Sequence, residues 1–256
     1  GNFIFRTIEF EQMEHQWFCK EGTDTQYYEE FKKKAWDFLV DLGFDPEHLR
    51  YKDHDKLAHY AKSACDIQYL FPIGWSELNG IHNRTDYDLS RHSQFSGKSM
   101  EYLDPVTNEK YVPYCIEPSL GVDRMLLAFL CDAYDEETLE GGDVRTVLHL
   151  HPALAPFKAA VLPLQKNKLG ALAGEIYAEL AKHFMVDYDE TGSIGKRYRR
   201  QDEIGTPFCV TLDFTTVGDA ETPADNCVTV RERDSMQQVR LPITELVSYL
   251  SERLAY

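Results

Sequence analysis

The 256-residue sequence lacks long apolar runs, basic charge and paired cysteines. Uninterrupted apolar stretches such as Met125–Leu130 are far below the roughly 20 residues that a membrane span needs, which argues against a membrane protein. The N-terminus has no initiator Met, no basic segment and no apolar segment of the kind found in secretory signals. The chain therefore reads like the middle of a longer one.

The six cysteines are scattered, with no C-x-x-C pair and no close Cys/His spacing. A zinc site needs close ligand pairs, and a chain of this size does not need disulfides to fold. The spacing therefore predicts reduced, buried thiols in a cytoplasmic protein, and neither zinc nor haem is expected.

Positive charge is also scarce: 27 basic and 43 acidic residues give a net charge of -16. Such a chain repels phosphate at long range, which disfavours non-specific binding to nucleic acids or anionic lipid. The imbalance is uneven, since residues 145–256 hold 13 basic and 15 acidic residues whereas residues 1–144 hold 14 and 28. A polyanion would meet its least repulsive surface in the second half.

Hydrophobic periodicity predicts an α+β fold for the first half, with an antiparallel sheet. Asp24–Leu42 has apolar residues at three- and four-residue spacing and is followed by Gly43, which predicts a helix of about five turns. A turn is expected at Asn79-Gly80. The other elements expected in this half are strands at 3–5, 17–19, 64–75 and 111–117 and a helix at 120–130.

The second half alternates strands and helices, which predicts a small α/β domain. The acidic segment 132–143, which contains Gly141-Gly142, is the best linker candidate. Domains are therefore expected at 1–143 and 144–256. Within the second, strands are expected at 159–164, 185–188, 208–214 and 227–231, and helices at 169–184 and 243–254.

The opening segment carries the first candidate site. If it is a strand, Arg6, Phe10 and Glu14 lie on one face, about 6 to 7 Å apart for each step of two residues. This row suits a phosphate, an adenine face and an ammonium group in turn. The alternative is an ordinary strand with a solvated, charged edge.

Two further stretches suit nucleotide chemistry. Glu77, between a Trp-bearing strand and the expected turn, offers hard oxygen ligands for Mg²⁺; the alternative is a surface carboxylate. In the second stretch, Glu117-Pro118-Ser119 precedes Gly121 and a helix with Arg124 in its first turn. Here Glu117 can pair with an amine, Ser119 can limit pocket depth and Arg124 can bind an anion, although a capped helix with a packing role fits as well.

Together these motifs resemble the class II aminoacyl-tRNA synthetases. Arg6-x-x-x-Phe10 resembles the second half of motif 2, and Gly121-x-Asp123-Arg124 resembles the end of motif 3. Four segments narrow the resemblance to the homodimeric glycyl-tRNA synthetases: Phe-Arg-Thr-x-Glu-Phe-Glu-Gln-Met-Glu at 5–14, Trp-Ser-Glu-Leu-x-Gly-Ile at 75–81, Arg-Thr-Asp-Tyr-Asp-Leu at 84–89 and Glu-Pro-Ser at 117–119. The resemblance implies ATP, Mg²⁺, glycine and tRNA(Gly) as ligands.

The resemblance also implies roles for single residues. Phe10 would stack on adenine, while Arg6 and Arg124 would contact phosphates as catalytic cations and Glu77 would serve ATP and Mg²⁺. The resemblance implies that the opening segment and the stretch 117–124 fold against each other around the ligands. Residues assigned to ATP are Phe5, Arg6, Thr7, Phe10, Glu77, Leu78, Gly121 and Arg124, and those assigned to glycine are Phe10, Glu14, Arg84, Glu117 and Ser119. For Arg84, contact with the substrate carboxylate is slightly favoured over bracing Asp86 and Asp88.

The second half resembles the anticodon-binding domain of the same family. Its most characteristic segment is 194–208, in which four cations lie within five residues: Lys196, Arg197, Arg199 and Arg200. With Tyr198 available for stacking, this cluster predicts a tRNA-facing patch, which Arg231, Arg233 and Arg240 can extend. The alternative is a solvated charge run compensated by Asp202 and Glu203.

The chain departs from the family pattern in two ways. Ile8 stands where a second Arg is expected, and the sequence begins after motif 1 and the Arg-x-Glu of motif 2. The chain thus resembles a C-terminal portion of the enzyme, and we expect it to be inactive by itself in forming aminoacyl-adenylate. Two other hypotheses stay open: a non-catalytic RNA-binding accessory protein on the same scaffold, and a synthetase for another small amino acid.

Overall fold

The computed structural model describes residues 3–255 and divides the chain into two compact units, one that runs to Asp132 and one that begins at Ala133. The boundary follows the first residue of the segment 132–143, which was expected to be a linker. Tyr134–Thr138 (β9) pairs with Val144–Leu148 (β10) as an antiparallel hairpin, and Gly141-Gly142 forms its turn with positive φ angles. Because these strands satisfy each other's backbone groups, the segment is part of the second unit.

The first unit contains a six-stranded antiparallel sheet in the order β1-β8-β5-β4-β3, with β2 also paired to β8. Its strands are β1 (Gln12–Glu14), β2 (Trp17–Cys19), β3 (Leu49–Asp53), β4 (Ser63–Phe71), β5 (Gly74–Thr85) and β8 (Tyr114–Gly121). Apolar residues alternate along the central strands, so one face carries Ile67, Ile81 and Ile116, all fully buried. The expected α+β fold is confirmed.

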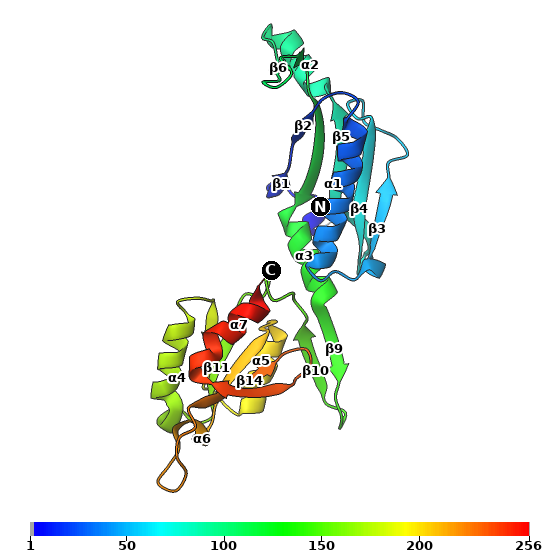
Figure 1. Cartoon of the computed structure of the whole chain (residues 1–256). Coiled ribbons are helices and arrows are strands. Elements are labelled where there is room, and N and C mark those ends of the chain that lie inside the picture. Colours follow the sequence, from blue (N-terminus) through cyan, green and yellow to red (C-terminus); the bar gives the residue numbers. More distant parts are fainter. Residues whose placement is uncertain (1–2, 256) are drawn as a thin grey trace. The chain divides into compact units, whose positions relative to one another are not determined.

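Helices cover that apolar face. The first is α1 (Asp24–Asp41), which packs across β5 and β8 (Figure 1), and the second is α3 (Val122–Ala133), which follows β8 without a loop. Gly43, at φ 100°, ends the first helix as predicted, with its N–H bonded to Val40 O. The unit is completed by the short elements η1 (Phe3–Phe5), η2 (Pro46–His48), α2 (Tyr87–Ser96), β6 (Tyr102–Leu103) and β7 (Lys110–Tyr111).

The structure corrects three expectations in this unit. The single strand expected at 64–75 is interrupted by a turn at 72–73, which separates β4 from β5. Phe3–Phe5 is a 3-10 turn instead of a strand, because the Phe5 ring packs edge-on against Phe71 with centroids 5.0 Å apart. The strand expected over the opening segment is limited to Gln12–Glu14. Asn79-Gly80 is not a turn but the middle of β5, bonded to β4 on one side and β8 on the other; pairing on both edges overrides the local turn propensity.

The second unit is the expected α/β domain. Its sheet has the order β12-β11-β13-β14-β15, in which β11 is parallel to β12 and β13 and the remaining pairs are antiparallel. The strands are β11 (Ala159–Pro163), β12 (Val186–Tyr188), β13 (Phe208–Leu212), β14 (Cys227–Glu232) and β15 (Gln238–Pro242). The helical elements are α4 (Lys166–Leu180), α5 (Ile194–Glu203), α6 (Phe214–Val217), η3 (Ile243–Glu245) and α7 (Leu246–Leu254).

Two cores flank this sheet. On one face, α4 and α7 bury Leu169 and Leu250 against Val161 and Val210. On the other face, α5 packs Ile194 and Tyr198 against a small cluster of Ala160, Leu162 and Cys209. Because α5 covers this second face, only part of its surface is left for solvent or a ligand.

Candidate active site

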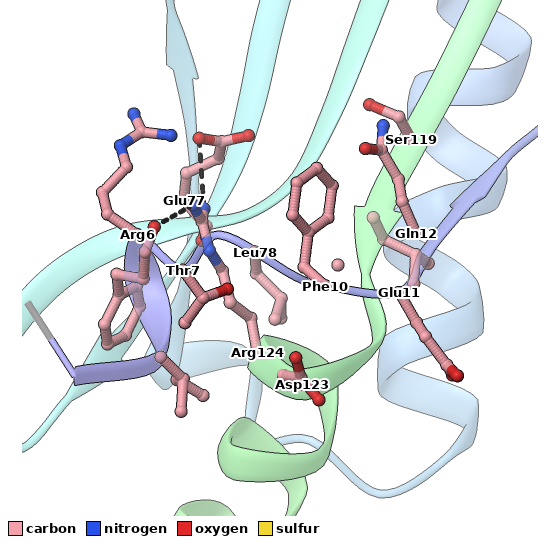
Figure 2. A pocket seen from close by; sticks show the side chains of 14 residues that line it. Arg6, Thr7, Phe10, Glu11, Gln12, Glu77, Leu78, Ser119, Asp123 and Arg124 are labelled. Carbon is pink, nitrogen blue, oxygen red and sulfur yellow. Dashed lines mark hydrogen bonds and ion pairs between the residues drawn. The ribbon is translucent and has the colours of Figure 1, made fainter. Parts of the chain in front are cut away.

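Three segments that are distant in sequence line one pocket in the first unit (Figure 2). They are the opening segment, the middle of β5 and the elbow at which β8 passes into α3. The structure therefore brings together all eight residues assigned to ATP, as well as Ser119. Side chains from these segments that line the pocket include Phe5, Arg6, Thr7, Phe10, Gln12, Glu77, Leu78, Ser119, Asp123 and Arg124.

Arg124 joins all three segments. From the first turn of α3, its Nη1 donates to the backbone O (3.1 Å) and the carboxylate (3.2 Å) of Glu77, and its Nη2 donates to Phe5 O at 3.0 Å. The guanidinium also lies 5.4 Å from the centre of the Phe5 ring. The helix that follows β8 directly thus places a fixed cation at one end of the pocket.

The opening segment reaches the pocket as a loop. Arg6 and Phe10 lie between the 3-10 turn and β1, and Phe10 is 63% exposed. Figure 2 shows the Phe10 ring between the end of the pocket with Arg6 and Glu77 and the end with Gln12 and Ser119. The flat ring is accessible on the pocket side, which is what stacking on a base requires.

Glu117 is held at the centre of the sheet by two donors. Its side chain is buried and accepts bonds from Arg84 Nη1 at 2.9 Å and Gln16 Nε2 at 3.0 Å. On the neighbouring strand β1, Glu14 stands opposite Ser119 and accepts from Gln12 Nε2 at 2.5 Å. The structure therefore places two carboxylates and a small hydroxyl side by side on one face of the sheet.

Arg84 braces neighbouring carboxylates in the structure, and its contact with a substrate carboxylate stays a prediction. Its Nε and Nη2 donate to Asp88 at 2.7 and 3.2 Å, and its Nη1 donates to Glu117. The bond from Arg84 also lowers the pKa of Asp88. Asp86 accepts a bond from Ser90 OH, so the expected brace involves Asp88 but not Asp86. Arg84 therefore fixes Glu117 in place.

Sequence reasoning missed Gln16 and His82 on this face. Gly80, His82 and Arg84 alternate along β5, and the register sets Gly80 opposite Ser119 and His82 opposite Glu117. Side chains of directly paired residues project from the same face of a sheet. The alternation was visible in the sequence, but the turn expected at Gly80 concealed it.

The cationic cluster of the second unit is only partly exposed. Arg197 is 2% exposed, and its Nη1 donates to Pro163 O at 2.7 Å, so it cannot face RNA. Tyr198 packs on the small core and bonds Thr211, which removes it as a stacking platform. Arg199 is half-buried, Arg200 pairs with Asp189, and Lys196 is exposed.

The three arginines expected to extend the patch also have structural partners. Arg231 binds Asp202 with both terminal nitrogens, and Arg233 donates to Gly205 O and Asp234. The buried Arg145 completes this cluster through Asp202 at 2.9 Å. Arg240 pairs with Asp213 and Asp225. These groups stabilise the unit and offer little free charge to a ligand.

Carboxylates that could meet a divalent cation are present in both units. In the first unit, Glu11, Glu77 and Asp123 line the pocket. In the second unit, Asp135, Glu137 and His149 lie within ligand distance of one another, although Glu137 pairs with Arg145 and His149 with Asp234. In the part of the chain that the structure describes, no helix combines the length and apolarity needed to cross a membrane.

Comparison with known proteins identifies relatives for both units. Residues 158–253 match a family model described as anticodon binding domain. The chain is 60% identical to a Glycine--tRNA ligase of Clostridium tetani and 61% identical to one of Geobacillus thermodenitrificans, each over 258 residues. Both alignments cover 100% of this chain and 54% of the relative. The chain thus spans about half the length of the curated relatives it matches.

A solved structure shows the same fold. Giardia lamblia prolyl-tRNA synthetase, in complex with prolyl-adenylate, matches with a TM-score of 0.65 over 96% of this chain and 51% of that one, at 17% identity. The expected class II synthetase architecture, an antiparallel sheet followed by an α/β anticodon-binding domain, is thereby confirmed. Along its whole length the chain is similar to a portion of these glycine--tRNA ligases.

Proposed function

We propose that the protein to which this chain belongs is a glycine--tRNA ligase, which activates glycine with ATP and transfers the glycyl group to tRNA(Gly). One observation carries the proposal: a single pocket is lined by an aromatic ring, two arginines and Ser119, with Glu14 and Glu117 on the adjoining sheet face. An accessory RNA-binding protein would have no chemical use for this combination. In its full-length form we expect the enzyme to be a cytoplasmic homodimer.

The nucleotide would lie along the pocket from Phe10 to Arg124. In the proposed arrangement, adenine stacks on Phe10 while Arg6 and Arg124 contact the phosphates from opposite sides. Phe5, Thr7, Leu78 and Gly121 would form the surrounding wall. This arrangement is supported by the way Arg124 is fixed, because a cation already held in place loses little freedom when a phosphate arrives.

Glycine would occupy the end of the pocket near Ser119. Its ammonium would pair with Glu14 and Glu117, which leaves its carboxylate directed toward the phosphates. The bonds from Arg84 and Gln16 keep Glu117 in one orientation. Because the Ser119 side chain is small and lies beside both acids, it would limit the space next to the glycine α-carbon.

The chemical step needs no side-chain base. The glycine carboxylate oxygen forms a bond to the α-phosphorus while the bond from that phosphorus to the bridging oxygen breaks, and pyrophosphate leaves with the electron pair. Catalysis is then positioning together with cationic stabilisation of the phosphate charge by Arg6 and Arg124. Mg²⁺ would neutralise phosphate oxygens, and the carboxylates of Glu77, Glu11 and Asp123 are hard oxygen ligands that fit it.

The second unit would bind the anticodon arm of tRNA(Gly). The match to an anticodon binding domain supports this role. On α5, Lys196 is the best-placed cation, because Arg197 is buried and Arg200 is paired with Asp189. Arg199, half-buried beside it, has an Nη1 atom without a partner among the described residues.

The test uses glycyl-sulfamoyl adenosine, a stable mimic of glycyl-adenylate, in isothermal titration calorimetry. We expect the wild-type chain to bind it and Phe10→Ala to bind roughly 5- to 150-fold more weakly, because stacking of a base on an aromatic ring is worth about 1–3 kcal/mol. Phe95→Ala is the matched control, since that ring is 80% exposed on α2, away from the pocket. Absence of binding by the wild-type chain would contradict the proposal.

A further inference from the structure

Gly80 leaves a narrow space on the sheet face that carries Glu14, Glu117 and Ser119. The register places Ser119 between Glu14 on β1 and Gly80 on β5. A Cβ atom at Gly80 would lie 3.6 Å from Ser119 Oγ. The space above Gly80 is therefore next to the point where the glycine α-carbon would lie, on the side opposite Glu14.

The imidazole of His82 borders this space. The same Cβ atom would lie 3.0 Å from His82 Cε1 and 3.6 Å from His82 Nδ1, so the ring edge that carries these two atoms leans over Gly80. A distance of 3.0 Å between carbon atoms is shorter than the optimum of about 3.5–4.0 Å. A methyl group on Gly80 itself would therefore press on the His82 ring, whereas its contact with Ser119 Oγ would be an ordinary one. The imidazole edge, more than Ser119, thus closes the space directly above Gly80.

The His82 ring has one buried nitrogen whose hydrogen-bonding capacity is not used. Its Nδ1 atom is buried and has no hydrogen-bond partner among residues 3–255. Burial, followed by the nearby His54, lowers the pKa of His82, so the ring is neutral at pH 7. Buried polar atoms are nearly always bonded, and an unpartnered nitrogen beside Ser119 is the arrangement expected of a group that meets a ligand.

We propose that His82 is a specificity-determining residue, whose imidazole edge closes the space over Gly80 so that an α-carbon bearing a methyl group cannot occupy the position beside Ser119. The inference rests on the proposed function, because it assumes that the amino acid lies against Glu117 and Ser119. A substituent directed away from Glu14 would meet the His82 ring. An amino acid with a side chain is then excluded sterically, by the His82 ring on β5 as well as by Ser119.

The test compares glycyl- and alanyl-sulfamoyl adenosine by isothermal titration calorimetry with three variants. For His82→Ala we expect the preference for the glycyl analogue to fall by about tenfold or more, the range that one methyl group commands in a closed pocket. Gly80→Ala, which fills the same space, should weaken binding of the glycyl analogue. His48→Ala is the control, because the His48 ring bonds Asp132 on α3 and contacts Tyr69, not His82; its preference should match the wild type.

The outcomes separate the two proposals. If the wild-type chain binds the glycyl analogue and His82→Ala keeps the wild-type preference, the role of His82 is wrong and the proposed function stands. If the wild-type chain binds neither analogue, the proposed function itself fails. Should His82→Ala not fold, as judged by circular dichroism, His82→Asn takes its place: an unchanged preference for the glycyl analogue then overturns the inference.

Discussion

The two units use arginine in opposite ways. In the second unit, Arg145 and Arg231 are buried and share the carboxylate of Asp202, which neutralises part of their charge inside the fold. In the first unit, Arg124 and Arg6 line a pocket. A count of cations therefore does not locate a ligand site: the dense cluster on α5 is largely structural, whereas two arginines far apart in the sequence line one pocket.

The largest effect is expected from Asp202→Ala. It leaves the buried guanidinium groups of Arg145 and Arg231 without their shared partner, and breaking a buried pair costs about 3–5 kcal/mol. The free energy of unfolding from urea titration should fall by that amount. Glu252→Ala is the control in the same unit, because its side chain is 77% exposed and its ion pair with Arg253 is long. Equal losses in both variants would contradict the structural role.

A second comparison separates neighbours on α5. Arg197→Ala leaves Pro163 O without its donor and should lower the free energy of unfolding by about 1–3 kcal/mol. Lys196→Ala should stay within about 0.5 kcal/mol of the wild type but weaken binding of tRNA(Gly), measured by filter binding at two salt concentrations. If Arg197→Ala weakens tRNA binding more than Lys196→Ala while folded, the assignment of the two roles is reversed.

In the pocket of the first unit, Arg124→Ala should weaken ATP binding by roughly 10- to 150-fold, because a hydrogen bond to a charged group is worth about 1.5–3 kcal/mol. Titration calorimetry with ATP and Mg²⁺ measures the change. Arg91→Ala is the matched control: Arg91 lies exposed on α2, where it bonds Gln94. Similar affinities for all three proteins would show that Arg124 serves only to tie the segments together.

The smallest effect is expected at Asp213, where bonds from Arg240 and Thr215 outweigh burial and lower the pKa from 3.8 to about 2. Because the pKa is lowered in the folded state, the carboxylate stabilises the fold above about pH 4, and this contribution is lost as the pH falls toward 2. The difference in free energy of unfolding between wild type and Asp213→Asn should therefore shrink over that interval in urea titrations. A constant difference would mean that Asp213 does not titrate there.

Much of the fold could be predicted from local patterns. The helix predicted to begin at Asp24 is confirmed. Most of the residues with three- and four-residue apolar spacing pack into the core, and the helix ends before Gly43 as predicted. The strand predicted for the opening segment was wrong. Aromatic residues favour strands in general, but here the Phe5 ring packs on Phe71 and the backbone forms a turn. The hairpin of β9 and β10 was taken for a linker, since Gly141-Gly142 marks a turn in either case.

The candidate site was predicted to a similar extent. Arg6, Phe10, Glu77, Ser119 and Arg124, which the motifs selected, all line one pocket, while the ligand roles assigned to them stay predictions. The motifs did not reveal that Arg84 serves Glu117, because a sequence does not state which carboxylate a guanidinium faces. His82 was missed for a related reason: its importance comes from the register between β5 and β8.

The sequence alone determined the types of elements, the chemical groups available and the family they resemble, because these depend on periodicity and on residue identity. Only the tertiary structure decided which charges are neutralised. Whether an arginine is buried on a carboxylate, as Arg231 is on Asp202, or lines a pocket, as Arg124 does, depends on strand pairing across tens of residues. Local sequence carries no record of those distances.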